Sequence, residues 1–402
     1  MEETLGNLTI IGNGTFNNTL NGTDEDNVTC WNEYCWDIEE YEDHLNQHIF
    51  PTWQEWVVVV LYFLTFVLGV VGNFLVVFAV WRNHNMRTVT NIYIVNLAVG
   101  DFLVISLCLT PTLVQDITYT WFLGTTMCKI LLFLQNVSVS VSVLTLGAIS
   151  MERWYAICHP LSFKSTLSRA RNTIIIIWTV SCSVALPELI VADTFGYSFP
   201  KPFTSILLTS CAPSWLLWVQ FVYQIALMIA MYLFPLILMG ITYANIAYVL
   251  WRKEIPGEIA GRKSMIDGKG HNQEDKLQSR RKAAKMLITI VIVFALCYLP
   301  VHLVNILRYV GALKNLSSDA ATLQSLITHW LPYFNSSINP VIYNFMSAKF
   351  RKEFKSACFC FVGVYYRQPF RRPRGETFTM TFSQSNYSNC HTEEVTMSSF
   401  KD

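Results

Sequence analysis

The chain has 402 residues, of which 52% are hydrophobic and 14% are charged. This balance is too apolar for a soluble globular protein of that size, so we expect a membrane protein. The net charge of +1 hides an asymmetry, because residues 1–55 hold about a dozen Asp and Glu and no Lys or Arg. The two ends of the chain are therefore expected to face different environments.

Seven apolar stretches are long enough to cross about 30 Å of hydrocarbon. They cover residues 56–81, 91–114, 127–151, 173–192, 216–250, 284–310 and 322–346. Inside a bilayer the backbone must satisfy its own hydrogen bonds, so each stretch is predicted to form an α-helix. The sequence thus predicts an all-α membrane protein in which residues 56–346 form a bundle of seven transmembrane helices.

Basic residues follow the first, third, fifth and seventh stretches, whereas the other loops hold little beyond Lys201 and Lys314. They are Arg82, Arg87, Lys164, Arg169, Arg171, Arg280 to Lys285, and Lys349 to Lys355. By the positive-inside rule the N-terminus lies outside the cell and the C-terminus lies in the cytoplasm. We therefore expect a multi-pass protein of the plasma membrane, whose first span serves as an uncleaved anchor.

Residues 1–55 are predicted to be an extracellular tail that carries glycans. Its candidate glycan acceptors head Asn-x-Ser/Thr sequons at Asn7, Asn13, Asn17, Asn21 and Asn27. The following segment, WDIEEYEDHLNQHIF at 36–50, has apolar residues at roughly helical spacing with acids between them. It is interpreted either as an amphipathic helix that covers the mouth of the bundle and attracts a basic ligand, or as a solvated acidic linker.

The eleven cysteines show no metal-ligand spacing. Cys128 and Cys211 both fall at the predicted outer surface, in the oxidising compartment, so a disulfide is predicted between the start of the third helix and the loop before the fifth. Cys30 and Cys35 form either a second, small disulfide loop or two unpaired thiols.

Residues 347–402 are predicted to be cytoplasmic. The segment AKFRKEFKSACFCF favours a short amphipathic helix after the seventh span, with Phe350 and Phe354 on one side and basic residues facing anionic membrane lipids. Cys358 and Cys360 are interpreted either as palmitoylation sites or as free cysteines. The Ser- and Thr-rich remainder is expected to be disordered and to be phosphorylated by kinases.

Asp101 is a carboxylate at bilayer depth, where a charge is costly and therefore indicates function. Residues on other helices are expected to converge on it; they are Asn73, Ser142, Asn335 and Asn339. Oxygen ligands of this kind suit a cation such as sodium, or a proton site. The alternative is a solvated acid with a structural role only.

Glu152 and Arg153 end the third span at its cytoplasmic side. We expect a releasable ion pair between these adjacent residues, because arginine can exchange one partner for another. The alternative is an arginine that extends to lipid phosphate. Prolines within the spans mark predicted bends, and they are Pro187, Pro235, Pro300 and Pro340.

These residues appear one set per helix and in order: Gly72-Asn73, Asp101, Cys128, Glu152-Arg153-Trp154, Trp178, Pro235, CYLP and NPVIY. Together they resemble the rhodopsin-like G-protein-coupled receptors. The chain departs from the usual pattern in ERW and in CYLP, where the family usually has Asp-Arg-Tyr and Cys-Trp-x-Pro. The stretches MRTVTNIYIVNLAVGD, QNVSVSVSVLTL, RWYAICHPLSFKST and LWRKEIPG are similar to the orexin receptors and the allatotropin-type receptors.

The resemblance implies two functional sites. The ligand pocket in the outer half would be lined by Gln135, Tyr298, Asn305, His329 and Tyr333. The inner switch would consist of Glu152, Arg153, Asn339, Pro340 and Tyr343. Taken singly, a buried Gln or His in such a pocket has the alternative role of crosslinking helices. Gln135 stands where aminergic receptors need an Asp for an ammonium group, which argues against a monoamine ligand.

The resemblance also implies the partners. They are a peptide ligand of the orexin or allatotropin type, a heterotrimeric G protein of the calcium-mobilising Gq class, receptor kinases and arrestin, with no nucleic acid. No enzymatic activity and no cofactor are expected, apart from the candidate sodium ion. The alternatives are an RFamide-type peptide or a lipid as the ligand. A seven-helix transporter or channel is disfavoured, because inverted repeats are not seen in the sequence.

Overall fold

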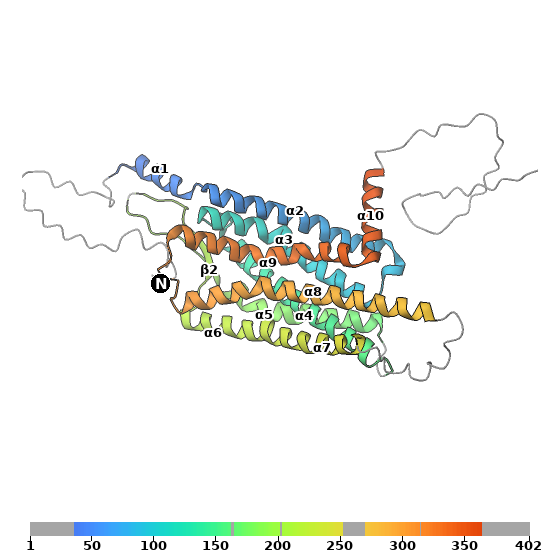
Figure 1. Cartoon of the computed structure of the whole chain (residues 1–402). Coiled ribbons are helices and arrows are strands. Elements are labelled where there is room, and N and C mark those ends of the chain that lie inside the picture. The colour runs from blue at the N-terminus through green and yellow to red at the C-terminus, as the bar shows by residue number, and fades with distance from the viewer. Residues whose placement is uncertain (1–35, 162–164, 202, 252–269, 314, 364–402) are drawn as a thin grey trace, which may run out of the picture.

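The computed structural model describes residues 36–161, 165–201, 203–251, 270–313 and 315–363. Its long helices lie side by side in one bundle (Figure 1). Several predictions fall outside the described residues: the sequons at Asn7, Asn13, Asn17, Asn21 and Asn27, the pairing of Cys30 and Cys35, and the Ser- and Thr-rich tail.

Six helices of the described residues are long and apolar enough to cross a membrane. They are α2 (Trp53–Arg82), α3 (Val89–Thr118), α4 (Gly124–Cys158), α5 (Leu167–Val191), the continuous run of α6 (Leu217–Met228), η2 (Ile229–Leu233) and α7 (Phe234–Trp251), and the apolar part of α8 (Gly270–Tyr309). Each coincides with a predicted span and extends it by a few residues at one or both ends.

The seventh predicted span is the helix α9 (Ser318–Met346), which is more polar than the other six. It packs against α2, α3 and α8, so protein rather than lipid surrounds much of its surface. The indole Nε1 of Trp330 donates to Thr65 Oγ1 at 2.8 Å. Gly72 allows a close approach, because a Cβ there would lie 2.8 Å from the Cβ of Pro340.

A hydrogen-bond network joins α3, α4 and α5. Asn96 Nδ2 donates to Thr145 Oγ1 at 2.8 Å, and Trp178 Nε1 donates to Asn96 Oδ1 at 2.8 Å. Buried polar groups require such partners, so this network fixes the relative positions of the three helices.

The fifth span contains one π-helical turn, η2, directly before Pro235. Proline has no backbone N–H, so the regular α-helical hydrogen-bond ladder is interrupted there. The wider turn carries Tyr232, whose hydroxyl donates to the backbone carbonyl of Ala295 on α8 at 2.9 Å. The irregular turn thus becomes a contact with α8.

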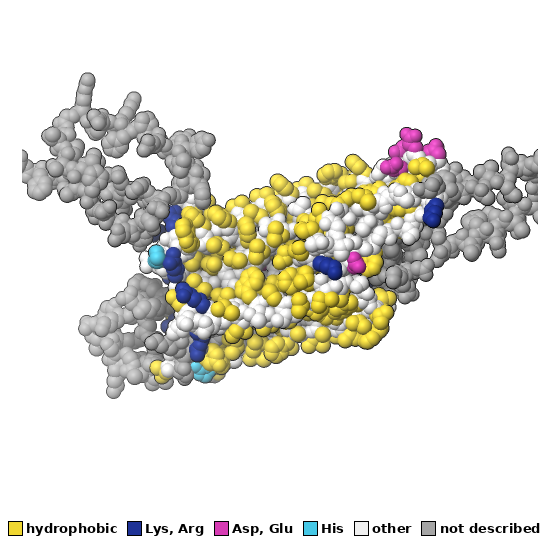
Figure 2. Space-filling view, turned by 180° about the vertical axis from the view of Figure 1, so that it is seen from behind, with side chains coloured by type: hydrophobic (Ala, Val, Ile, Leu, Met, Phe, Trp, Pro, Cys, Tyr) yellow, Lys and Arg dark blue, Asp and Glu magenta, His cyan; other side chains and the backbone are white. Residues whose placement is uncertain are grey.

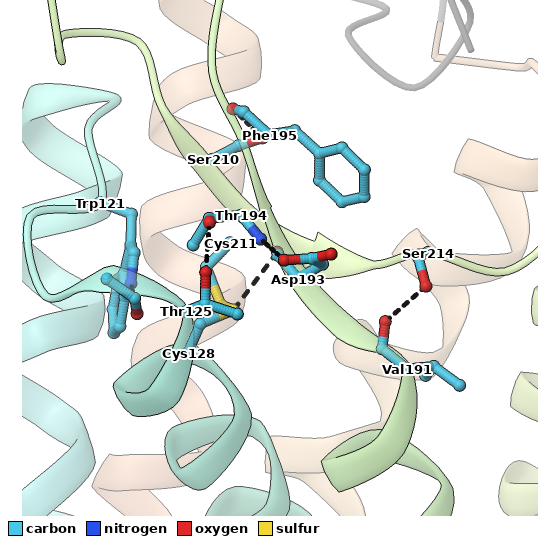
Figure 3. The surroundings of a disulfide bond; sticks show 11 residues. Trp121, Thr125, Cys128, Val191, Asp193, Thr194, Phe195, Ser210, Cys211 and Ser214 are labelled. Carbon is cyan, nitrogen blue, oxygen red and sulfur yellow. Dashed lines mark hydrogen bonds between the residues drawn. A yellow bond between two sulfur atoms is a disulfide. The ribbon is translucent and has the colours of Figure 1, made fainter.

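A two-stranded antiparallel hairpin covers one end of the bundle. Strand β1 (Ala192–Phe195) pairs with β2 (Ser210–Pro213), and Thr194 lies opposite Cys211. The predicted disulfide between Cys128 and Cys211 is confirmed, with a Cα–Cα distance of 5.6 Å, and it ties the hairpin to the start of α4 (Figure 3). We call this the outer end, following the predicted orientation.

The acidic segment before the first span is the helix α1 (Ile38–Ile49), capped by the side chain of Asp37. Tyr41 and Leu45 are buried against Phe203 and Leu208 of the loop between β1 and β2. Of the two interpretations of this segment, the structure shows the amphipathic helix. Its acidic side chains face solvent at the outer end (Figure 2), and they are Glu39, Glu40, Glu42 and Asp43.

At the opposite, inner end, the predicted amphipathic helix is α10 (Ala348–Gly363), which crosses the bundle axis (Figure 1). Phe350 and Phe354 are buried in the bundle, and Tyr343 stacks on Phe350 with ring centroids 5.5 Å apart. Asn83, beside the short helix η1 (His84–Met86), donates from Nδ2 to Glu353 Oε1 at 2.9 Å. The basic side chains of α10 are exposed, and they are Lys349, Arg351, Lys352 and Lys355.

Candidate functional site

A cavity of about 990 Å³ lies in the outer half of the bundle, beneath the hairpin. Side chains of α3, α4, α6, α8 and α9 line it together with β2. All five residues predicted to contact ligand lie in its wall, and they are Gln135, Tyr298, Asn305, His329 and Tyr333. Three different helices contribute them, so the fold gathers residues that are up to about 200 positions apart in the chain.

A closed set of hydrogen bonds lies deep in this cavity. Gln135 Nε2 donates to Thr112 Oγ1 at 3.0 Å and to Tyr333 Oη at 2.8 Å, and these two hydroxyl groups lie 2.9 Å apart. Both amide hydrogens of Gln135 are therefore in use. Its carbonyl oxygen has no partner among the described residues and is left to accept a hydrogen bond from a ligand.

Asp116 and His329 form a hydrogen-bonded pair between α3 and α9 in the cavity wall, and this contact is an ion pair when His329 is protonated. The Nδ1 atom of His329 lies 2.8 Å from one carboxylate oxygen and 3.0 Å from the other. Sequence analysis missed Asp116, because the predicted span stopped two residues before it. An acid one turn beyond Thr112 was the signal, since helix neighbours at i and i+4 share a face.

Aromatic side chains connect the cavity with the part of α8 that contains Pro300. Tyr298 lines the cavity and packs on Phe294, with ring centroids 4.7 Å apart. Tyr232 packs on His302, with centroids 4.8 Å apart. Pro300 lies inside α8 between Tyr298 and His302, two residues from each, and a proline inside a helix favours a bend at that place.

Asp101 is fully buried in the middle of the bundle. Its carboxylate accepts from Ser142 Oγ at 3.3 Å and from Asn339 Nδ2 at 2.9 Å. Asn73 was expected beside it, but its amide nitrogen donates to the backbone carbonyls of Gly69 and Ser336, at 2.9 and 3.1 Å.

The oxygen atoms of Ser142 and Asn339 beside Asp101 are of the kind that a sodium ion binds. The amide oxygens of Asn73, Asn335 and Asn339 are buried and have no hydrogen-bond partner. A carboxylate and neutral amide oxygens are the hard ligands that such a cation prefers. Among the described residues no group of three or more His, Cys, Asp or Glu could hold a metal ion, so a transition-metal site is not indicated there.

The expected ion pair between Glu152 and Arg153 is absent from the ion pairs of the described residues. Glu152 instead accepts a hydrogen bond from the hydroxyl of Ser165, and the Nε atom of Arg153 is buried without a partner. Neighbouring residues on a helix do not face each other, so the two side chains diverge. Arg153 lines a second cavity, of about 210 Å³, at the inner end.

The other predicted switch residues lie on α9 and have separate contacts. Asn339 bonds to Asp101, Pro340 lies against Gly72, and Tyr343 stacks on Phe350. The hydroxyl of Tyr343 is buried and has no hydrogen-bond partner. These residues therefore form a path along α9 rather than one cluster with Arg153.

A contact between α7 and α8 at the inner end was not foreseen. Arg281 donates from Nε and Nη2 to the backbone carbonyl of Leu250, at 3.0 and 2.7 Å. Its guanidinium also lies 5.8 Å from the ring centre of Trp251, and Lys285 lies 5.9 Å from the same ring. We call this contact of Arg281 with Leu250 and Trp251 the α7–α8 clasp.

The apolar helix bundle thus holds a large cavity with several polar side chains at one end and a small cavity lined by two arginines at the other. Residues 72–343 match the family model described as 7 transmembrane receptor (rhodopsin family), and the chain belongs to this family. It is accordingly a multi-pass protein of the plasma membrane and a receptor rather than an enzyme. Family membership also removes the transporter or channel alternative.

Two relatives extend the comparison. The chain is 34% identical to a QRFP-like peptide receptor of Branchiostoma floridae over 312 residues, which are 76% of this chain and 78% of that protein. It is 30% identical to the tachykinin-like peptides receptor 86C of Drosophila melanogaster over 382 residues, which are 90% of this chain and 71% of that protein.

Proposed function

We propose that this chain is a receptor for an amidated neuropeptide and that it transmits binding to a heterotrimeric G protein. The printed names of both relatives, which are peptide receptors, support a peptide as the ligand. The observation that carries the proposal is the free carbonyl oxygen of Gln135 deep in the outer cavity. A C-terminal amide donates N–H groups to such an acceptor, whereas a free carboxylate only accepts.

The charges of the outer end support a basic peptide rather than a lipid. Four exposed acids of α1 lie beside the hairpin, and they are Glu39, Glu40, Glu42 and Asp43. Complementary charge accelerates the encounter with a basic ligand and disfavours a free C-terminal carboxylate. Within this class we propose an orexin- or allatotropin-like peptide first, with an RFamide-type peptide as the second candidate because one relative is a QRFP-like peptide receptor.

The proposed mechanism is a shift in population between two arrangements of α8. A peptide that contacts Tyr298 and Asn305 more favourably when α8 has moved outward biases the bundle towards that state. The bend at Pro300 permits the movement. Outward movement enlarges the inner cavity beside Arg153, which then accommodates the G protein, most simply one of the Gq class.

Two further parts of the proposal concern regulation. A sodium ion held by Asp101 with oxygens of Ser142, Asn335 and Asn339 would supply a positive charge to a carboxylate that is otherwise buried with neutral partners.

Receptor kinases and arrestin would act on the cytoplasmic tail. Cys358, which is exposed on α10, remains a predicted palmitoylation site together with Cys360.

Calcium release in cells expressing the chain tests the proposed function. Cells are challenged with orexin-like, allatotropin-like and RFamide peptides, each as the C-terminal amide and as the free acid. We expect a response to one amide at nanomolar concentration and a much weaker response to its free acid. Equal responses to amide and acid would contradict the role of Gln135. Silence across all peptides, with surface expression verified and with other G-protein pathways assayed, would remove the proposed ligand class.

A further inference from the structure

The inner cavity is lined by two guanidinium groups and by no acid. It lies between α4, α7 and α8, and Arg153 and Arg280 are its charged lining residues. The remaining lining is neutral, with Tyr243 as its polar member and small or branched apolar side chains around it. Two cations therefore face one space of about 210 Å³.

Among the described residues neither arginine has a carboxylate in a direct ion pair. Glu152 accepts its hydrogen bond from Ser165. The Nε atom of Arg153 is buried without a partner. The Glu152 carboxylate attracts Arg153 through space but forms no ion pair with it among the described residues, and a second cation, the exposed Arg280, faces the same cavity. The lining of the cavity therefore carries positive charge and no negative charge, which favours an anion there.

We propose that this inner cavity binds a phosphate group, which bridges Arg153 on α4 and Arg280 on α8. Its volume exceeds that of one water molecule several-fold, since a water occupies about 30 Å³ in the liquid. The planar fork of donors on arginine matches phosphate oxygens, and charge-assisted hydrogen bonds of this kind are the strong ones.

The surroundings concentrate anions at this cavity. Lys282 and Lys285 are exposed on α8, close to Arg280 in sequence. Basic side chains gather at the inner end of the molecule (Figure 2). Two sources of phosphate fit this place, which are the headgroup of an inner-leaflet phosphoinositide and free inorganic phosphate.

A bound phosphate would hold α8 near α4 and so stabilise the arrangement seen in the structure. This consequence rests on the proposed receptor function, since outward movement of α8 would separate the two arginines. The binding itself requires only the geometry of the cavity. A test of binding therefore remains informative even if the proposed ligand or the G-protein coupling is wrong.

The test uses the purified full-length receptor in nanodiscs of neutral lipid. Inorganic phosphate and a short-chain phosphatidylinositol bisphosphate are titrated separately, and the midpoint of thermal unfolding reports binding, because a ligand of the native state raises it. Arg280→Gln is compared with Lys282→Gln, which removes the same charge two residues away from a side chain that does not line the cavity. Arg280→Lys keeps the charge.

We expect Arg280→Gln to weaken binding about tenfold, Lys282→Gln to change it less than about twofold, and Arg280→Lys to retain most of it. A shift with the phosphoinositide alone identifies a lipid headgroup, and a shift with inorganic phosphate as well identifies the phosphate group itself. No shift of the unmodified receptor with either compound overturns the proposal. Equal losses in Arg280→Gln and Lys282→Gln also overturn it, because they indicate general surface attraction.

Discussion

Hydrogen bonds to Thr112 and Tyr333 fix the side-chain amide of Gln135, so that its carbonyl oxygen is the atom that can bind a ligand. Thr112 and Tyr333 accept both of its amide hydrogens, so its orientation is fixed before any ligand binds. A side chain that is already fixed loses little conformational entropy when a ligand binds to it, which favours binding. The same bonds give Gln135 a second role as a link between α3, α4 and α9, and the two roles can be separated by experiment.

Replacing Gln135 by Ala should reduce the preference for an amidated agonist. We expect the amide form to lose about tenfold in potency while the free acid changes little, because the lost hydrogen bond involves only the amide. Calcium dose–response curves, normalised to surface expression, measure both. An equal loss for the two forms of the peptide, together with lower expression, would assign Gln135 to helix linkage alone.

Asp101 illustrates a buried charge whose environment is only partly satisfied. Two hydrogen bonds reach its carboxylate, while the nearby asparagines keep unpartnered oxygens. The sequence predicts that polar residues converge on Asp101, but it does not predict the partners of Asn73. They are backbone carbonyls, which no residue pattern marks.

Exchanging Asp101 for Asn should abolish any effect of sodium on agonist binding. In the unmodified receptor we expect agonist affinity to fall as sodium replaces a large organic cation at constant ionic strength, because the ion favours one of the two states. Competition binding measures the affinity. Ser106→Ala serves as the control, since Ser106 bonds only within α3. If the unmodified receptor shows no sodium dependence, the cation site is wrong.

At the scale of helices, the inner ends of α7 and α8 are joined by more than apolar packing. The α7–α8 clasp places the Arg281 guanidinium on the carbonyl of Leu250 at the end of α7, where positive charge also interacts favourably with the helix dipole. Any outward movement of α8 relative to α7 must break these hydrogen bonds. The clasp therefore opposes activation in the proposed mechanism.

Replacing Arg281 by Ala should raise signalling in the absence of agonist. Hydrogen bonds from a charged group contribute about 1.5–3 kcal/mol, so their loss should shift the balance of closed and open states by about tenfold or more. Basal inositol phosphate accumulation measures this, with Lys282→Ala as a matched control on an exposed neighbour. Unchanged basal signalling, with unchanged spacing between spin labels on α7 and α8, would show that the clasp plays no part.

The transmembrane helices were predictable from the sequence, because a long apolar stretch with few charged residues must form a helix inside a bilayer. What lies between helices was predictable only in part. Cys128 and Cys211 could be paired from topology, whereas the partner of His329 depended on where α3 ends. The clasp could not be predicted, since its acceptor is the backbone of Leu250 and its geometry depends on how two helices cross.

At the scale of the whole molecule, the charges of the two ends differ as the sequence suggested. Acidic side chains lie on α1 at the outer end and basic side chains at the inner end (Figure 2). The position of α1 was left open by sequence, because its apolar spacing is equally compatible with a linker. The decisive contact is with Phe203 and Leu208, which lie about 160 residues further along the chain.

Replacing Leu45 by Asp should detach α1 from the hairpin and weaken the response to a basic peptide. A buried leucine exchanged for a charge loses its packing and cannot remain against Phe203. We expect about a tenfold loss of potency with normal surface expression, because α1 lies outside the bundle. The variant Asn46→Asp serves as the control, because Asn46 is exposed on the same helix and the substitution adds the same charge. Equal potency of Leu45→Asp and the unmodified receptor would leave α1 without a role in binding.

The π-helical turn at Ile229–Leu233 has a practical consequence for comparing this chain with others. Such a turn holds one residue more than an α-helical turn, so the side chains on either side of it are out of phase with a regular helix. An ungapped alignment with a regular helix that is correct at Gln224, before the turn, would be out of register by one residue at Tyr243, after it. Residue equivalences for this receptor should therefore be counted separately on the two sides of the turn.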